Sequence, residues 1–468
     1  MKSEEFATAM KFIVIGITDH PQPFFPPEVL EAIKSGKIFS GGKRHHEIVA
    51  PLLPKDAVWI DITAPLDAVF DQYAHLSRRS HGGSKFFTLH SSLFTIIVFA
   101  SGDPLFFGFA NTIRRKLPEA DIKVYPSFNS LQLLAHRLVM PYHDLRIVSL
   151  TGRPWPEFDR ALIERAPKIG ILTDREHTPA AIAQRMTDYG YTDYQMHVGE
   201  HLGNPTEEKV TTLSLEEAAT RSFATPNCLI LHSSLITHSS SLITHHSTLI
   251  THHSSLITHH STLSTHHTPF GIPESDFALL DGREKMITKM PIRLLTLQAL
   301  DLSRRHVLWD IGACTGSVSI EARLLFPHLQ IHAFEIRPEC EAIIEENARR
   351  HGTPGITLHI GDFLEADLSL ITHHSSLITH HSSLSLQPDA VFIGGHGGHL
   401  KEIMAKVLTV LSPDGCIVMN SVKAPKVTTD SHQLWDEACR ELGLRQDPPT
   451  RIILNDNHPI EILKCKKR

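Results

Sequence analysis

The stretch that most constrains the fold runs from Trp309 to Glu321 and reads Trp-Asp-Ile-Gly-Ala-Cys-Thr-Gly-Ser-Val-Ser-Ile-Glu. Residues 307–309 before it form a short apolar run typical of a strand, and residues 317–325 after it have the pattern of a helix start. The turn between them carries two glycines, which suit a tight bend or a close approach to a ligand. Because the first N–H groups of a helix point at whatever lies above such a turn, the pattern predicts a cofactor-binding loop.

The segments that follow support a nucleotide-like cofactor. Residues 331–334 are apolar and end in Glu335, about 20 residues beyond Gly312, which suits a carboxylate that binds a ribose diol. A third apolar run, residues 356–360, leads to Asp362 and Phe363, which are placed to frame an adenine. A fourth strand, residues 389–393, runs into a Gly-Gly-His-Gly-Gly turn.

These features resemble a class I S-adenosylmethionine (SAM) methyltransferase. The alternative is an NAD-binding Rossmann domain. We prefer the methyltransferase because a dehydrogenase normally shows the full G-x-G-x-x-G pattern, whereas this loop reads Asp-x-Gly-x-Cys-x-Gly.

The N-terminal half also alternates apolar runs with helical patterns, which predicts an α/β fold. Expected strands include residues 11–15, 96–100, 147–150, 168–172 and 194–198, and a helix is expected over 130–138. Three motifs stand at the ends of such elements: Gly-Gly-Lys-Arg-His at 41–45, Ala-Ser-Gly-Asp-Pro-Leu-Phe at 100–106, and Pro-Ser-Phe-Asn-Ser at 126–130.

These three motifs resemble the tetrapyrrole methylase family, in the branch that acts on precorrins. In the C-terminal half, residues 271–277, 286–289, the Asp310 loop and residues 388–395 resemble the decarboxylating precorrin C15-methyltransferases. In this order the halves are similar to a family of bifunctional precorrin methyltransferases. The resemblance implies SAM-dependent methylation of a precorrin macrocycle at C5 and C15, with decarboxylation of the ring C acetate, in cobalamin (corrin ring) biosynthesis.

A seven-residue repeat of the type Ser-Ser-Leu-Ile-Thr-His-His separates the halves and recurs near residue 370. We expect a tetrapyrrole methylase fold of two subdomains over 11–230, a disordered His-rich linker over 231–269, and a Rossmann-like class I methyltransferase domain over 270–468 with an insertion at 369–386. The repeat could bind metal, but an in-frame expansion of a short DNA repeat in surface loops is the preferred interpretation.

Charge and cysteine content exclude several classes. A net charge of −6 argues against a surface that coats nucleic acid. The six cysteines form no C-x-x-C pair, no run approaches the roughly 18 apolar residues of a membrane helix, and the start does not read as a signal peptide. We expect a cytoplasmic homo-oligomer that binds a precorrin or a cobalt-precorrin, with neither nucleic acid nor membrane as partner.

The resemblance implies two SAM sites, one in each half. Expected cofactor contacts in the C-terminal site are Thr288, Gly312, Ala313, Cys314, Thr315, Gly316, Glu335, Asp362 and Phe363; those in the N-terminal site are Gly16, Ser101, Gly102, Asp103 and Leu105. Because a precorrin bears many carboxylates, the candidate substrate-binding residues are Lys289, Arg293, His396, Arg44 and Arg153. No catalytic residue stands out, and no metal is expected, since His396 and His399 lack a carboxylate partner.

Three other functions remain open. An RNA methyltransferase built on the C-terminal half would need a basic face or a base-clamping motif after the fourth strand, and the glycine-rich turn at 394–398 is neither. A His-rich metal-binding protein would lose nickel or cobalt affinity when the repeats are removed. A decayed copy would fold but would be inactive because of the insertions.

Overall fold

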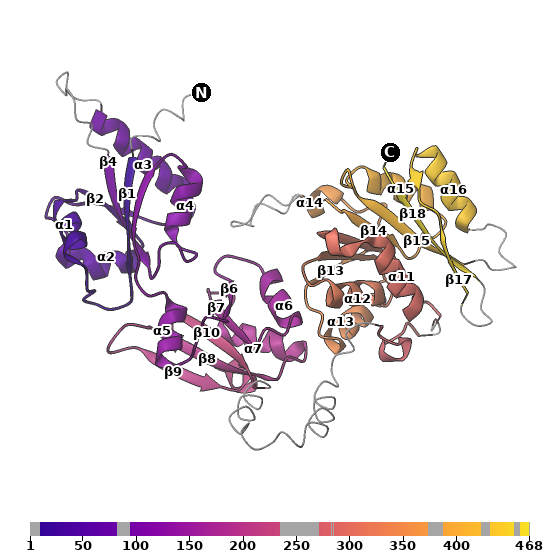
Figure 1. The fold of residues 1–468 in the computed structure, drawn as a ribbon, viewed down its shortest axis with the longest axis horizontal. Helices are drawn as coiled ribbons and strands as arrows, with labels where there is room; N and C mark the ends of the chain where they lie inside the picture. Colours follow the sequence, from indigo (N-terminus) through magenta and orange to yellow (C-terminus); the bar gives the residue numbers. More distant parts are fainter. Residues whose placement is uncertain are drawn as a thin grey trace, which may run out of the picture. The chain divides into compact units, whose positions relative to one another are not determined.

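The computed structural model describes residues 10–81, 94–234, 271–281, 283, 285–372, 387–422, 431–453 and 459–467 (Figure 1). Most of the linker predicted at 231–269 and most of the insertion predicted at 369–386 lie outside these residues. The described chain is an α/β protein with three sheets, so the predicted fold class is confirmed.

The first sheet has five parallel strands in the order β3-β2-β4-β1-β5. Strand β1 lies between β4 and β5, and its buried Phe12, Val14 and Ile15 pack into the two cores that cover the sheet. Such double burial explains the nearly unbroken apolar sequence of β1. The elements are β1 (Met10–Ile17), α1 (Pro27–Ser35), β2 (Ile38–Gly41), α2 (Lys43–Val49), β3 (Val58–Asp61), α3 (Leu66–His81), β4 (Phe94–Ser101), α4 (Phe109–Lys116) and β5 (Asp121–Tyr125).

The second sheet is mixed, in the order β6-β7-β10-β8-β9. Strands β6 and β7 are parallel, whereas β10 runs antiparallel to β7 and β9 runs antiparallel to β8. Helix α5 begins at a capping box in which the Asn129 side chain accepts the Gln132 N–H at 2.9 Å. The elements are α5 (Ser130–Arg137), β6 (Arg146–Ser149), α6 (Pro156–Ile163), β7 (Lys168–Leu172), α7 (Pro179–Asp188), β8 (Tyr194–Glu200), β9 (Lys209–Leu213), α8 (Leu215–Ala219) and β10 (Asn227–Ser233).

The third sheet has the order β13-β12-β11-β14-β15-β18-β16, with β17 paired to β18. The first five strands are parallel, and β16, β17 and β18 complete the sheet by antiparallel pairing. Helices that begin at residues 290, 317, 340, 368, 400 and 431 accompany it. The elements are α11 (Met290–Leu300), β11 (Val307–Ile311), α12 (Ser317–Leu325), β12 (Gln330–Glu335), α13 (Cys340–Arg350), β13 (Ile356–Ile360), α14 (Leu368–Thr372), β14 (Ala390–Ile393), α15 (Leu400–Leu408), β15 (Cys416–Val422), α16 (Ser431–Glu441), β16 (Arg445–Gln446), β17 (Thr450–Ile452) and β18 (Ile460–Lys466).

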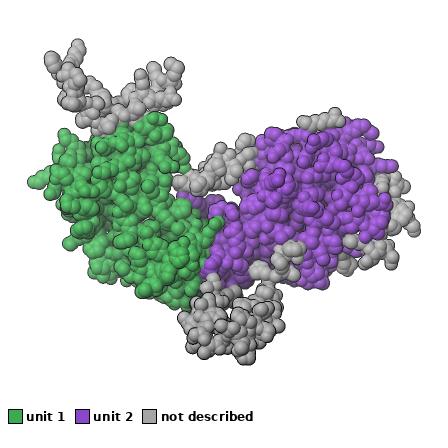
Figure 2. Space-filling view, in the orientation of Figure 1, with its two compact units in different colours: residues 1–151, 168–181, 195–232 green, residues 152–167, 182–194, 233–468 purple. Residues whose placement is uncertain are grey.

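The chain divides into two compact units (Figure 2). One contains residues 1–151, 168–181 and 195–232, and the other contains residues 152–167, 182–194 and 233–468. The domain limits expected from the sequence therefore remain a prediction. All six cysteines are free and buried. In the described part of the chain, no helix has the length and apolar character needed to cross a membrane.

Two candidate cofactor sites

The C-terminal candidate site lies where the order of the third sheet reverses. Strand β11 pairs with β12 on one side and β14 on the other, so the loops after β11 and β14 leave the same edge in opposite directions. This arrangement opens a crevice at the carboxyl ends of parallel strands, where ligands of such folds bind.

Glycine lets the two loops meet in this crevice. Gly312 has a φ of +79°, and a Cβ added to it would lie 2.7 Å from the Gly395 nitrogen. A Cβ added to Gly394 would lie 2.9 Å from the Gly312 oxygen. Only residues without side chains permit both this contact and the left-handed backbone, so the loop sequence is explained by geometry.

A cavity of about 1080 Å³ lies over these loops. Of the cofactor residues expected from the sequence, all but Gly316 line it: Thr288, Gly312, Ala313, Cys314, Thr315, Glu335, Asp362 and Phe363. Gly316 instead begins helix α12 with a φ of +72° and faces Ile344 of α13. Its role is to turn the chain into the helix.

Asp310, at the end of β11, lines the same cavity and has an unpartnered oxygen. Its Oδ2 atom accepts a hydrogen bond from Ser319 Oγ at 2.7 Å, whereas its buried Oδ1 has no partner among the described residues. Burial raises the pKa of Asp310 to about 6, although the Ser319 hydrogen bonds lower it. A buried acceptor without a donor is costly, so this atom fits a ligand that brings an N–H or O–H group.

Glu335 holds the loop from below. Its Oε2 atom accepts the Cys314 N–H at 2.8 Å, and its Oε1 atom accepts Arg337 Nη1 at 2.9 Å and the Arg337 N–H at 3.1 Å. The residue is 1% exposed. A carboxylate offers about four acceptor positions, so one remains for a ligand hydroxyl, and displacement of the Arg337 guanidinium would free another.

The structure corrects the expectation for Arg293. Its guanidinium is fully buried, donates to Glu321 Oε2 at 2.6 Å and to the Thr288 oxygen at 2.8 Å, and does not line the cavity. The sequence spacing predicted that Arg293 lies near Lys289 and faces the substrate. In the structure, the Arg293 side chain instead points into the core, where it pairs with the buried Glu321. Lys289 does line the cavity, as do Lys285 and Arg337.

His396 lies in the turn after β14 and lines the cavity. Its Nδ1 atom accepts the Gly398 N–H at 3.2 Å, so the proton of the neutral ring is on Nε2. Burial and the neighbouring His399 lower the pKa of His396. At neutral pH the residue is therefore a neutral hydrogen-bond donor. Within the described residues, no group of three or more His, Cys, Asp or Glu side chains is placed to hold a metal.

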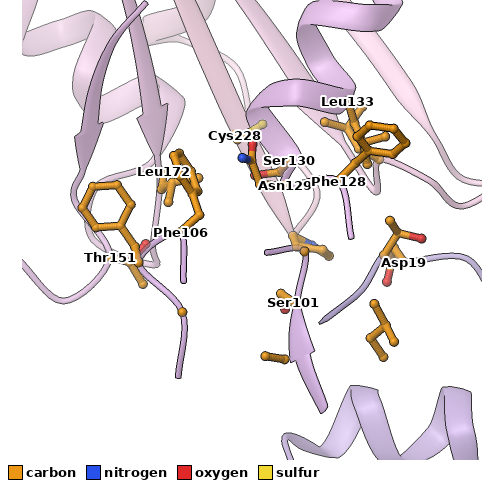
Figure 3. A pocket seen from close by; sticks show the side chains of 18 of the residues that line it. Asp19, Ser101, Phe106, Phe128, Asn129, Ser130, Leu133, Thr151, Leu172 and Cys228 are labelled. Carbon is orange, nitrogen blue, oxygen red and sulfur yellow. The ribbon is translucent and has the colours of Figure 1, made fainter. Parts of the chain in front are cut away.

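The N-terminal candidate site is a cavity of about 550 Å³ within the first compact unit. Phe106 and Phe128 lie on opposite sides of the view in Figure 3, with Ser101 below them. Both polar and aromatic side chains line this cavity. The polar residues include Asp19, Arg44, His45 and Ser101, and the aromatic ones include Phe99, Phe106, Phe107 and Phe128.

Several sequence expectations are not met in this cavity. Ser101, Gly102 and Arg44 line it, but Gly16, Asp103, Leu105 and Arg153 are not among its lining residues. A Cβ on Gly16 would lie 1.9 Å from the Gly102 oxygen, so Gly16 supports the loop from behind. Asp103 Oδ1 accepts the Leu105 N–H at 2.8 Å and shapes the turn locally, which leaves the Leu105 side chain exposed.

Sequence reasoning missed several residues of both cavities. His45 was recognised only as part of the motif at 41–45, Asp19 was not a candidate, and the aromatic lining residues carried no periodic signal. In the C-terminal cavity, Asn420 follows from the adjacency of β15 to β14, which no local pattern reveals. The run Lys-Arg-His-His directly after two glycines, which contains the predicted Arg44, was the available signal for His45.

The reversal of strand order at β11, the contact of Gly312 with Gly394 and Gly395, and Glu335 at the end of β12 define a Rossmann-like site for a nucleotide cofactor, a class that includes the SAM-dependent methyltransferases. Two observations show that the cavity fits such a cofactor: the unpartnered Asp310 Oδ1, and the cradle that a Cβ would fill.

Comparison with known proteins shows which methyltransferases this chain is similar to. Residues 281–443 match the family described as Precorrin methyltransferase domain, and residues 25–219 match the Tetrapyrrole (Corrin/Porphyrin) Methylases. The chain is 29% identical over 431 residues to the precorrin-6Y C(5,15)-methyltransferase (decarboxylating) of Sinorhizobium sp, covering 92% of this chain and 88% of that protein. It is 32% identical over 199 residues to the cobalt-precorrin-6B C(15)-methyltransferase (decarboxylating) of Salmonella typhi, covering 41% and 95%.

Among solved structures, the precorrin-6y C5,15-methyltransferase of Geobacter metallireducens GS-15 is 29% identical, covers 43% of this chain and 98% of its own, and has a TM-score of 0.34. The chain belongs to the precorrin methyltransferase family, with a tetrapyrrole methylase part preceding the precorrin methyltransferase part.

Proposed function

We propose that this chain methylates a precorrin or a cobalt-precorrin at C5 and C15 and removes the carboxyl group of the ring C acetate, as a step of corrin ring synthesis. Support comes from the match of both parts of the chain to relatives with these names and from the presence of a cavity in each compact unit. The proposal includes one SAM site in each half, domains at 11–230 and 270–468, a cytoplasmic location and a homo-oligomeric state.

In the C-terminal site, Gly312 to Thr315 and Thr288 would enclose the methionine part of SAM, Glu335 would bind the ribose, and Asp362 with Phe363 would contact the adenine. When bound, SAM supplies an electrophilic methyl group. The chain has to hold the macrocycle carbon in line with that group and exclude water, and it needs little acid–base help. Four side chains that can donate hydrogen bonds line the cavity and suit a polycarboxylate substrate: Lys285, Lys289, Arg337 and His396.

The observation that carries the proposal for this half is the meeting of Gly312 with Gly394 and Gly395 above the buried Asp310 and Glu335. The test is incubation of the purified full chain with SAM and a metal-free or cobalt precorrin, followed by mass spectrometry. Two added methyl groups with one lost carboxyl group are expected. One methyl without decarboxylation would restrict activity to the N-terminal half, and no methylation would refute the proposal.

A further inference from the structure

A hydrogen-bond network in the N-terminal cavity is centred on the hydroxyl group of Ser101. Arg44 Nη2 and His45 Nε2 each lie 2.9 Å from Ser101 Oγ. Arg44 is fixed in turn by Asp19, whose Oδ1 lies 2.5 Å from Nη1, and Asp19 Oδ2 lies 3.1 Å from His201 Nδ1. All of these atoms belong to the first compact unit.

The roles of donor and acceptor follow from the chemistry of each group. A guanidinium only donates, so Ser101 Oγ accepts from Arg44. His45 Nδ1 accepts the Gly42 N–H at 3.2 Å, so the neutral ring carries its proton on Nε2 and donates it as well. Burial and the adjacent Arg44 lower the pKa of His45 to about 4, which keeps the ring neutral near pH 7.

Ser101 therefore accepts two hydrogen bonds, and its own proton has to be donated elsewhere. In the described part of the chain, no acceptor receives it. Ser101 is exposed and lines the cavity beside Arg44, so a hydroxyl donor and a guanidinium donor face the same space. This pair suits a carboxylate, which accepts several strong hydrogen bonds from such groups.

We propose that Arg44 and Ser101 form a carboxylate-binding site in the N-terminal cavity, with His45 and Asp19 as positioning residues that hold the two donors. The inference rests on the proposed function, which offers two carboxylate sources: the methionine end of SAM and the acetate or propionate groups of the tetrapyrrole. Phe107 lines the same cavity, is 40% exposed and has a strained φ of +54°.

The test uses the full chain and two probes, S-adenosylhomocysteine and uroporphyrin, whose binding is followed by calorimetry and absorbance. Arg44→Met and Ser101→Ala should each lower the affinity for one of the two probes by about 10- to 100-fold. Ser101→Thr keeps the hydroxyl and should bind that probe nearly as tightly as the wild type does. A lower affinity for S-adenosylhomocysteine assigns the site to the cofactor, and a lower affinity for uroporphyrin assigns it to the substrate. Lys43→Met is the matched control, because it removes a charge from the exposed residue next to Arg44 on α2. It should change the affinity for neither probe.

His45 is tested by two further variants. His45→Gln keeps an amide donor near the place of Nε2, whereas His45→Phe keeps the ring and removes the donor. The glutamine variant should retain the probe affinity, and the phenylalanine variant should lose about as much as Ser101→Ala. Equal behaviour of the two would refute the positioning role.

If Arg44→Met and Ser101→Ala fold and bind both probes as the wild type does, the carboxylate site is wrong. Methylation by the wild type is measured separately with the precorrin. Failure of that reaction counts against the proposed function, whereas unchanged probe binding in the variants counts against this site alone.

Discussion

The carboxylate of Glu335 accepts a hydrogen bond from the main-chain N–H of Cys314 at 2.8 Å. Cys314 has a φ of +51°, a left-handed conformation that is unfavourable for a residue with a side chain. Glu335 thus holds a strained loop in place and also lines the cavity over it. The same carboxylate therefore contributes both to the shape of the loop and to the lining of the cavity.

Replacing Glu335 should disable the C-terminal site alone. Glu335→Ala removes the acceptor of the Cys314 N–H and a hydroxyl acceptor, so affinity for S-adenosylhomocysteine at this site should fall by ~10- to 100-fold. Methylation at C15 and decarboxylation should disappear, while methylation at C5 persists. Calorimetric stoichiometry and product mass distinguish the two halves. Loss of both activities would contradict independent sites.

The glycine cradle gives a matched pair of variants. Gly312→Ala combines a φ of +79° with a Cβ 2.7 Å from the Gly395 nitrogen, so it should destabilise the fold by ~1–3 kcal/mol and prevent cofactor binding. Gly395→Ala meets nothing within 4 Å and should fold normally. Urea unfolding compares their stabilities. An equally stable Gly312→Ala would contradict the close contact of the loops.

Asp310 should make stability depend on pH. Its pKa is about 6 in the folded protein and 3.8 ordinarily, so the folded state binds the proton more tightly. The protonated Asp310 therefore adds to the free energy of unfolding, by at most ~3 kcal/mol. This stabilisation is fully present below pH 3.8 and is lost as the pH rises through 6. Asp310→Asn keeps an acceptor for Ser319 and does not titrate. Its stability relative to the wild type should therefore increase between pH 4 and pH 7.5 in urea unfolding. A constant difference would show that the pKa is not raised.

Arg293 and Lys289 should respond differently to the loss of their charge. Arg293→Met leaves the buried Glu321 unpaired and should cost ~3–5 kcal/mol of stability. The double variant Arg293→Met with Glu321→Gln should recover part of that loss, because no buried charge remains.

Lys289→Met should leave the melting temperature unchanged and raise the KM for the precorrin, since Lys289 lines the cavity. A stable Arg293→Met with a raised KM would instead restore Arg293 as a substrate contact.

Much of the secondary structure was predictable because local patterns dominate it. Strands β7 and β13 and helix α12 occupy the predicted residues, and the other expected strands differ from the structure by a few residues at their ends. The added strands β9, β10 and β15 to β18 were not predicted. Strands β10 and β15 pair with segments far away in the chain, and a single sequence does not reveal such partners. Strands β9 and β17 pair with neighbours close in the chain, but their short sequences lack a clear alternating pattern.

The sequence alone determined the glycine-containing loop after β11 and the acid at the end of β12, because the left-handed turn and the buried carboxylate each demand a particular residue type at a fixed spacing. Only the tertiary structure decided which charges face a cavity. Arg293 turns toward the buried Glu321, whereas Arg44 and Ser101 meet although 57 residues separate them. The free energy of a charged group depends on what surrounds it in space, and packing, not spacing along the chain, determines those surroundings.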